Sequence, residues 1–87
     1  MLYESGDILS QRELTSFLVE KRKKLGLTQL DVAQKSKYEI TRQYYGMIEL
    51  GERIPSVRTA KSIAEVLDIP WTIFFEMKGN EKLLLNI

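Results

Sequence analysis

The chain has few of the side chains on which enzymes and metal sites depend. It contains no cysteine and no histidine, so thiolate chemistry, disulfides, and the commonest metal ligand and general base are missing. An enzyme would have to use carboxylates or lysine alone. Neither Asp31 with Glu39 nor Glu49 with Glu52 is accompanied by a plausible base, nucleophile or metal set. We therefore expect a protein that is not an enzyme and that needs no cofactor or metal.

The charged residues instead favour binding to a polyanion. Residues 21–62 carry ten Lys and Arg against four acidic residues, a local net charge of +6, whereas the rest of the chain carries −5. This asymmetry would present one basic face to a polyanion while the whole molecule stays near neutral. A solvated basic face without a partner explains the charge equally well. Charge alone therefore does not distinguish a polyanion-binding face from a solvated one.

Length and composition indicate one small domain. The chain has 87 residues, of which 44% are hydrophobic and 29% charged, the balance of an ordinary water-soluble globule. No apolar stretch approaches the roughly 20 residues needed to cross a bilayer, and residues 1–10 lack the pattern of a secretory signal. We therefore expect a cytoplasmic protein with no membrane partner.

Capping and turn residues predict the first two helices. Ser10-Gln11-Arg12-Glu13 is a capping-box pattern, and Gly26 suits a left-handed cap, so we expect a helix over about 11–25. Thr28 is the next N-cap candidate, and the helix after it should end at about residue 35 or 36. No strand-like alternation competes before residue 80.

Similar signals predict three further helices. Thr41 and Gly51 bracket a helix over about 42–50. Pro55-Ser56 precedes a helix over about 57–68, and Pro70 can open a short fifth helix. The expected apolar contacts of these two helices come from Val57, Ala60, Ile63, Ala64, Leu67, Trp71, Phe74 and Phe75.

The helix pattern predicts an all-α fold with short flanking segments. We expect an N-terminal extension over 1–9, a domain over 10–77 and a C-terminal tail over 78–87. The apolar residues of the tail can dock against the domain, pair with a second copy of the chain, or fray.

The order of these motifs resembles the phage-repressor and Cro-like helix-turn-helix family, also called the XRE family. The resemblance covers about residues 14–76 and implies a compact, five-helix, lambda-repressor-like domain. It also implies a transcriptional regulator of repressor type, from a phage or mobile element, that binds double-stranded DNA sequence-specifically. The matching residues are 25–29 (LGLTQ), 32–33 (VA), 48–56 (IELGERIPS), 64–69 (AEVLDI) and 74–75 (FF).

The resemblance implies that the helix over 42–50 reads bases in the major groove. Arg42 and Gln43 would face base edges in its first turn, with Gly46 and Met47 one turn later. Arg forms two hydrogen bonds with guanine and Gln forms two with adenine. The alternative is that Arg42 and Gln43 are simply exposed first-turn residues, whereas Tyr45 and Ile48 are expected in the core.

The resemblance also implies contacts with the DNA backbone, because helix N-termini and basic groups favour anions. The residues concerned are Gln29, Tyr44, Arg53, Ser56 and Arg58. Tyr44 would also suit a domain surface, and the others could be ordinary helix-starting or solvated residues. Arg22 would form a structural ion pair with Glu49, tying the first helix to the end of the third.

Two features depart from the common family pattern. The stretch 35–40 makes the turn about two residues longer, and Leu50 stands where Asn is more usual. If the extra residues shift the third helix, Lys37 or Tyr38 could touch the DNA backbone, and the roles of Arg42 and Gln43 could slip by one residue.

The resemblance leaves three functions open. The leading one is a regulator that binds a two-fold symmetric operator as a homodimer, because one short domain reads few base pairs. The second is the antitoxin of a toxin-antitoxin pair, whose partner would be a toxin; an antirepressor protein is another possible partner. The third is a protein-interaction adaptor without DNA binding, which would show no duplex binding even in dilute salt.

Overall fold

Side-chain caps on Ser and Thr set where the α-helices begin. The hydroxyl oxygens of Ser10, Thr28, Thr41 and Ser56 each accept a hydrogen bond from a backbone N–H of the following turn, which satisfies a donor that the helix leaves unpaired. At Ser10 an acidic residue completes the predicted capping box, and at Thr28 an acidic residue completes a second one that was not predicted. The helices are α1 (Gln11–Lys24), α2 (Gln29–Lys35), α3 (Arg42–Leu50) and α4 (Val57–Leu67).

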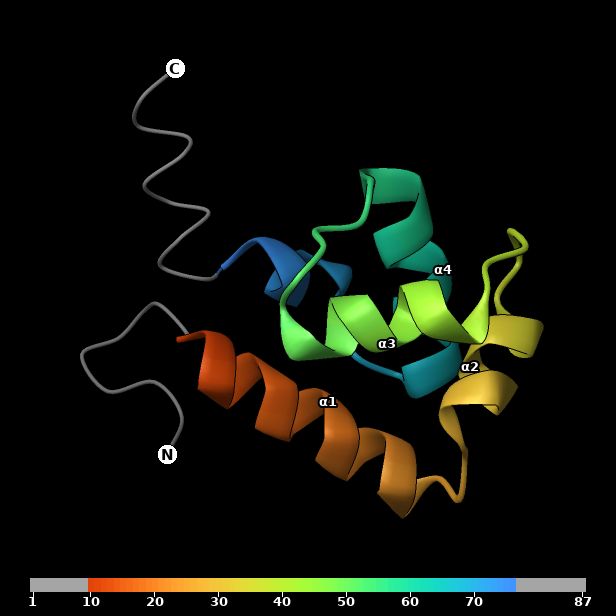
Figure 1. The fold of residues 1–87 in the computed structure, drawn as a ribbon, viewed down its shortest axis with the longest axis horizontal. Helices are drawn as coiled ribbons and strands as arrows, with labels where there is room; N and C mark the ends of the chain where they lie inside the picture. Colours follow the sequence, from red (N-terminus) through yellow and green to blue (C-terminus); the bar gives the residue numbers. More distant parts are fainter. Residues whose placement is uncertain (1–9, 77–87) are drawn as a thin grey trace.

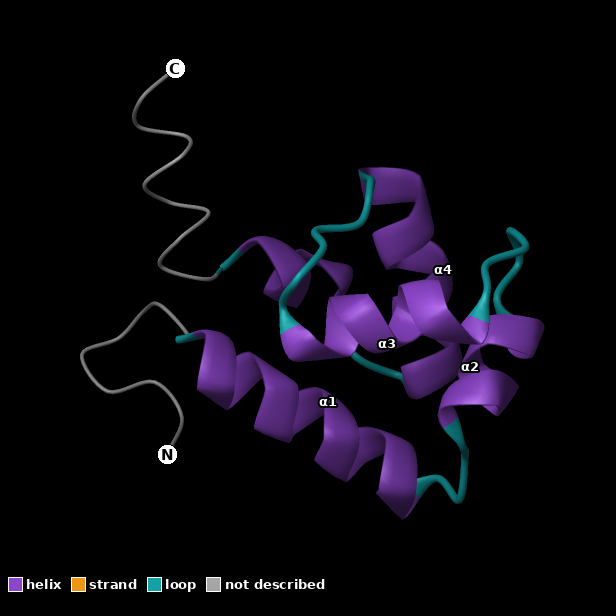
Figure 2. Cartoon of the chain, in the orientation of Figure 1, coloured by secondary structure: helices purple, strands orange, loops and turns teal. Residues whose placement is uncertain are grey.

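The computed structural model describes residues 10–76, and this part of the chain is helical without any strand (Figures 1 and 2). The predicted all-α class is confirmed. The predicted extension 1–9 and tail 78–87 lie outside the described residues. None of the helices within 10–76 has the length and apolar character that a bilayer crossing requires.

The short fifth helix that was predicted after Pro70 is not confirmed as a further α-helix, because the segment after α4 is a 3₁₀ helix, η2 (Trp71–Phe75). Its hydrogen bonds join residues three apart in the chain, such as the bond that the Ile73 N–H donates to the Pro70 carbonyl at 3.3 Å. Short segments commonly take this tighter form. The described domain therefore has four α-helices and one 3₁₀ helix.

Helix ends follow the predicted stop signals closely. Gly26 and Gly51 have φ angles of 74° and 82°, which lie in the left-handed region that favours glycine. Helix α4 ends at Leu67, one residue before the predicted end, because Asp68 already has a left-handed φ of 59°.

The core is built from one face of every helix. The predicted apolar contact of Val57 is wrong, because its side chain is 48% exposed; Leu25 and Leu30 are each 46% exposed. All three stand at or beside a helix end, where the chain turns away from the core. The buried apolar residues are Leu14, Leu18, Val32, Ala33, Tyr45, Ile48, Ala60, Ile63, Ala64, Leu67, Ile73 and Phe74.

The long turn between α2 and α3 is held by a buried pair of serines. The hydroxyl oxygens of Ser36 and Ser62 are hydrogen-bonded at 2.7 Å, and the Lys37 N–H donates to the Ser62 oxygen at 2.6 Å. This anchor on α4 lets residues 36–41 absorb the extra length. Helix α3 consequently begins at Arg42, as predicted.

We expect Ser62→Ala to lower the free energy of unfolding by about 1–3 kcal/mol, because the Ser36 hydroxyl and the Lys37 N–H would lose their buried partner. Ser16→Ala is the matched control, since Ser16 is an exposed serine inside α1. It should change stability by less than about 0.5 kcal/mol. Chemical denaturation measures both, and equal effects would contradict the anchoring role.

Candidate nucleic-acid interface

Helix α3 has one exposed and one buried face. Of the four predicted base-contacting residues, Arg42 and Gln43 are exposed, and Gly46 and Met47 are half-buried. The buried face carries Tyr45, Ile48 and Glu49. Tyr45 and Ile48 were predicted to be core residues, and this is confirmed. The polar first turn of α3 therefore points away from the core.

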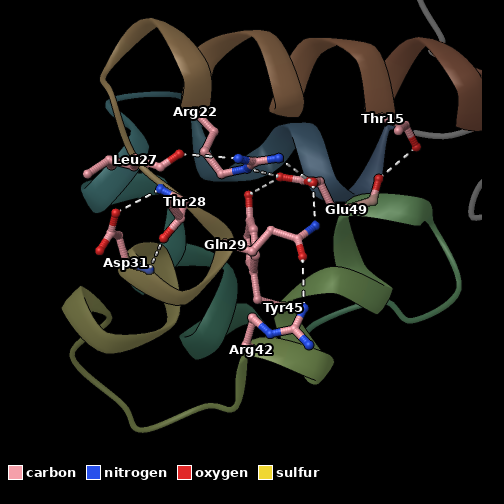
Figure 3. Close-up of polar contacts among 9 residues, drawn as sticks. All are labelled: Thr15, Arg22, Leu27, Thr28, Gln29, Asp31, Arg42, Tyr45 and Glu49. Atoms are coloured by element: carbon pink, nitrogen blue, oxygen red, sulfur yellow. Dashed lines mark hydrogen bonds and ion pairs between the residues drawn. The ribbon is translucent and has the colours of Figure 1, made fainter.

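The carboxylate of Glu49 is buried at the centre of a hydrogen-bond network (Figure 3). Its side chain is 3% exposed and forms an ion pair with Arg22, whose Nε lies 2.7 Å from Oε2. Arg22 Nη2 donates to Oε1 at 3.2 Å, and Gln29 Nε2 donates to the same oxygen at 2.8 Å. The Tyr45 hydroxyl donates to Oε2 at 2.8 Å. Both carboxylate oxygens thus have two donors each.

This network joins three helices. Arg22 comes from α1, Gln29 from the start of α2, and Glu49 from the end of α3 (Figures 1 and 3). Arg22 Nη1 also donates to the Leu27 carbonyl at 3.2 Å, and Thr15 Oγ1 donates to the Glu49 carbonyl at 2.6 Å. The position of α3 against α1 and α2 is therefore fixed by directional contacts as well as by apolar packing.

The ionisation of the network follows from its donors. Burial alone would raise the pKa of Glu49, but the hydrogen bonds from Arg22, Gln29 and Tyr45 outweigh burial and hold this pKa below its usual value. The hydrogen bond to Glu49 raises the pKa of Arg22. Burial, followed by the neighbouring Glu49 charge, raises the pKa of Tyr45. The network thus holds one carboxylate, one guanidinium and one neutral phenol.

Gln29 and Arg42, both predicted to contact DNA, lie side by side. Arg42 Nη1 donates a long hydrogen bond of 3.4 Å to Gln29 Oε1 (Figure 3). Gly46 lies beside the same amide, because a Cβ added there would stand 3.4 Å from Gln29 Oε1. One amide therefore connects the buried Glu49 network with the exposed first turn of α3.

Two members of the network were not predicted from the sequence. Gln29 and Tyr45 were not expected to bind Glu49, yet both donate to it. Tyr45 and Glu49 are four residues apart on α3, a spacing that brings side chains together on a helix. This contact could therefore have been predicted from the sequence. The hydrogen bond from Gln29 to Glu49 joins two helices, and no spacing in the sequence predicts it.

The predicted backbone-contacting residues lie on several elements. Arg53 is exposed in the loop after α3, and Arg58 is exposed in the first turn of α4. The Ser56 oxygen accepts the Thr59 N–H at 3.2 Å and so caps α4. Tyr44 is half-buried and packs partly against the core. Arg58 and Arg53 are thus available to solvent, whereas Ser56 and Tyr44 also have structural contacts.

Two of the acidic residues serve local structure. Asp31 accepts the Thr28 N–H at 2.8 Å as part of the α2 capping box, and Glu49 lies in the network above. Within residues 10–76, no three His, Cys, Asp or Glu side chains gather in a way that could hold a metal ion. The exposed first turn of α3 is thus a better candidate for a functional site than the acidic residues of this part of the chain.

We expect Glu49→Ala to lower the free energy of unfolding by about 3–5 kcal/mol, because the partly buried Arg22 charge would lose its partner. Glu52→Ala removes an exposed carboxylate three residues away and should change stability by less than about 0.5 kcal/mol. Thermal unfolding compares the two variants. Equal shifts in melting temperature would refute the network's role.

The lowered pKa of Glu49 predicts a pH dependence of stability. The charged carboxylate contributes fully above its ordinary value of 4.5, and this contribution is lost as the pH falls through the lower pKa of the folded state. Glu49→Gln keeps the shape of the side chain but cannot titrate. Below pH 4.5 the unfolding free energy of the variant should fall less steeply than that of the native chain, whereas parallel pH profiles would count against the lowered pKa.

The comparisons with known proteins agree with this architecture. A family model described as helix-turn-helix matches residues 18–74, from the middle of α1 into η2 and more than half of the chain. A Bacillus subtilis (strain 168) protein named uncharacterized HTH-type transcriptional regulator YqaF is 46% identical over 68 residues, which cover 78% of this chain and 87% of that protein. No solved structure matches significantly. The family that the sequence motifs resembled is thus confirmed, and the chain belongs to the helix-turn-helix family.

Proposed function

We propose that this chain is a transcriptional regulator that binds double-stranded DNA sequence-specifically and inserts α3 in the major groove. The observation that carries the proposal is the exposed, polar first turn of α3, held on a buried network that joins three helices. A B-DNA major groove admits one α-helix, and the preceding helix lies across the backbone to hold it there. The relative named a transcriptional regulator supports this function, and we propose repressor action of the phage or mobile-element type.

In the proposed complex, Arg42 and Gln43 contact base edges. Arg42 has one long hydrogen bond of 3.4 Å to Gln29, which its guanidinium can exchange for a guanine. Gln43 is exposed and can form two hydrogen bonds with an adenine. Gly46 and Met47 would lie over the groove one turn later, where the missing side chain of Gly46 lets the helix backbone approach the bases.

Gln29 is the proposed link between the protein core and the DNA backbone. A side-chain amide has two N–H donors, and one of those of Gln29 is used by Glu49. The second can donate to a phosphate oxygen while the first keeps the side chain in place. We further propose phosphate or sugar contacts for Arg53, Arg58, Ser56 and Tyr44, of which Arg53 and Arg58 supply the positive charge.

We propose that two copies bind a two-fold symmetric operator. One helix of nine residues reaches few base pairs, so a single domain would select its site poorly. Two copies related by a two-fold axis would read half-sites about 34 Å apart, one helical turn of DNA. Our candidates for the contact between the copies are the tail over 78–87 and the short helix η2.

Selection of bound sequences from a random duplex pool tests the function. We expect a palindromic site, with Gln43→Ala relaxing the preference at one position by about 1–3 kcal/mol. Arg53→Ala should weaken binding to all sequences alike and reduce the salt dependence by about one phosphate contact. Arg12→Ala, which removes an exposed arginine of α1, is the matched control and should change neither. The absence of duplex binding even in dilute salt would overturn the function and favour the adaptor.

A further inference from the structure

A basic and aromatic pocket lies between the long turn, α4 and the start of η2. Its volume is about 420 Å³, which falls in the range of about 300–1,000 Å³ typical of small-molecule sites. No residue of α3 lines it. We call it the α4 pocket. Its charged and aromatic lining residues are Lys37, Tyr38, Arg58, Lys61, Glu65 and Trp71.

The cations of the α4 pocket lie against aromatic rings. The Arg58 guanidinium carbon is 4.6 Å from the centre of the Tyr38 ring, and Lys61 Nζ is 5.0 Å from that of Trp71. Lys37 Nζ is 5.9 Å from the Tyr38 ring. Such contacts orient a cation without neutralising its charge.

The positive charge of the pocket is not balanced within the described domain. None of the three cations forms an ion pair with a residue of the described range 10–76. Glu65 is the one acidic side chain among the lining residues, so the lining carries a net charge of +2. Three oriented cations around a concave site favour the binding of an anion.

The turn side of the pocket is held in position before any ligand binds. Lys37 donates its backbone N–H to the buried Ser62 oxygen at 2.6 Å, and the neighbouring Ser36 hydroxyl is bonded to the same oxygen. The backbone of Lys37 is therefore anchored on α4. A preorganised wall reduces the entropy lost on binding.

We propose that the α4 pocket binds a small anion carried on a planar apolar body, such as an aromatic phosphate or carboxylate. Lys37, Arg58 and Lys61 supply the positive charge for the anion, and Trp71 supplies an aromatic surface for the ring. Duplex DNA fits this pocket less well, because the pocket has the size of a small molecule rather than of a double helix.

The same ligand would regulate DNA binding, an inference that rests on the proposed function. Arg58 lines the α4 pocket and is also a proposed DNA backbone contact. A ligand anion that engages Arg58 withdraws it from phosphate. Because coupling between two sites is reciprocal, ligand and DNA should each weaken the binding of the other.

Trp71 is the single tryptophan of the chain, so its fluorescence reports on the α4 pocket directly. The first experiment titrates the full chain with phenyl phosphate at constant ionic strength, and with benzoate to compare carboxylate with phosphate. Inorganic phosphate and benzyl alcohol, which carry the anion and the ring separately, are the control ligands. We expect saturable binding of phenyl phosphate at a concentration about tenfold or more below that of either control ligand. The absence of saturation, or equal binding of inorganic phosphate, would overturn the site as described.

Charge-removing variants localise the binding. Lys61→Gln and Lys37→Gln should each weaken phenyl phosphate binding by about tenfold, as expected when one charge-assisted contact is lost. Lys35→Gln removes the same charge from an exposed residue of α2 outside the pocket and should leave binding unchanged. The midpoints of the titrations are compared rather than the amplitudes of the fluorescence change, because Lys61 lies over the Trp71 ring and its removal can itself change the fluorescence. Equal midpoints in all three variants would overturn the assignment.

A second experiment separates the site from its regulatory role. Saturating phenyl phosphate should weaken binding of the selected duplex, compared with chloride at equal ionic strength, and Lys61→Gln should shift this effect to higher ligand concentration. Unchanged duplex affinity would overturn the regulation and leave the site standing. If the native chain binds no duplex, the proposed function fails together with the regulation, while the fluorescence result stands by itself.

Discussion

The buried carboxylate of Glu49 is the constraint on which the rest of the domain depends. A charge that is 3% exposed is costly unless it is paired and hydrogen-bonded. Its donors come from α1, α2 and α3, so the carboxylate is satisfied only when these helices take one arrangement. The lowered pKa of Glu49 is the electrostatic consequence of that arrangement.

This constraint explains how a small domain can hold a short helix in a fixed position. Nine residues make a marginal helix alone, and α3 gains its fixed position from tertiary contacts. The amide of Gln29 extends the network to Arg42 at the surface. The α4 pocket lies outside α3, so the proposed binding of a ligand can be coupled to the proposed binding of DNA through Arg58 without involving Arg42 or Gln43.

The sequence predicted the local structure well and the long-range contacts poorly. Helix boundaries follow from caps such as Thr41 and Gly51, which act within one turn of the chain. The pairing of Arg22 with Glu49 came from the family resemblance. The bonds to Glu49 from Gln29, and the anchor of the long turn on Ser62, join residues far apart in the chain and left no periodic signal. The type of η2 was missed because a short apolar turn fits either helix geometry.

A solved structure of the chain bound to a duplex recovered by selection would test directly whether the Glu49 network holds α3 for DNA binding. We expect α3 to lie in the major groove with Arg42 and Gln43 at base edges. We also expect the contacts of Glu49 with Arg22 and Gln29 to be the same as in the free protein. A complex in which α3 faces away from the DNA, or in which Glu49 loses these donors while α3 stays in the groove, would contradict this role of the network.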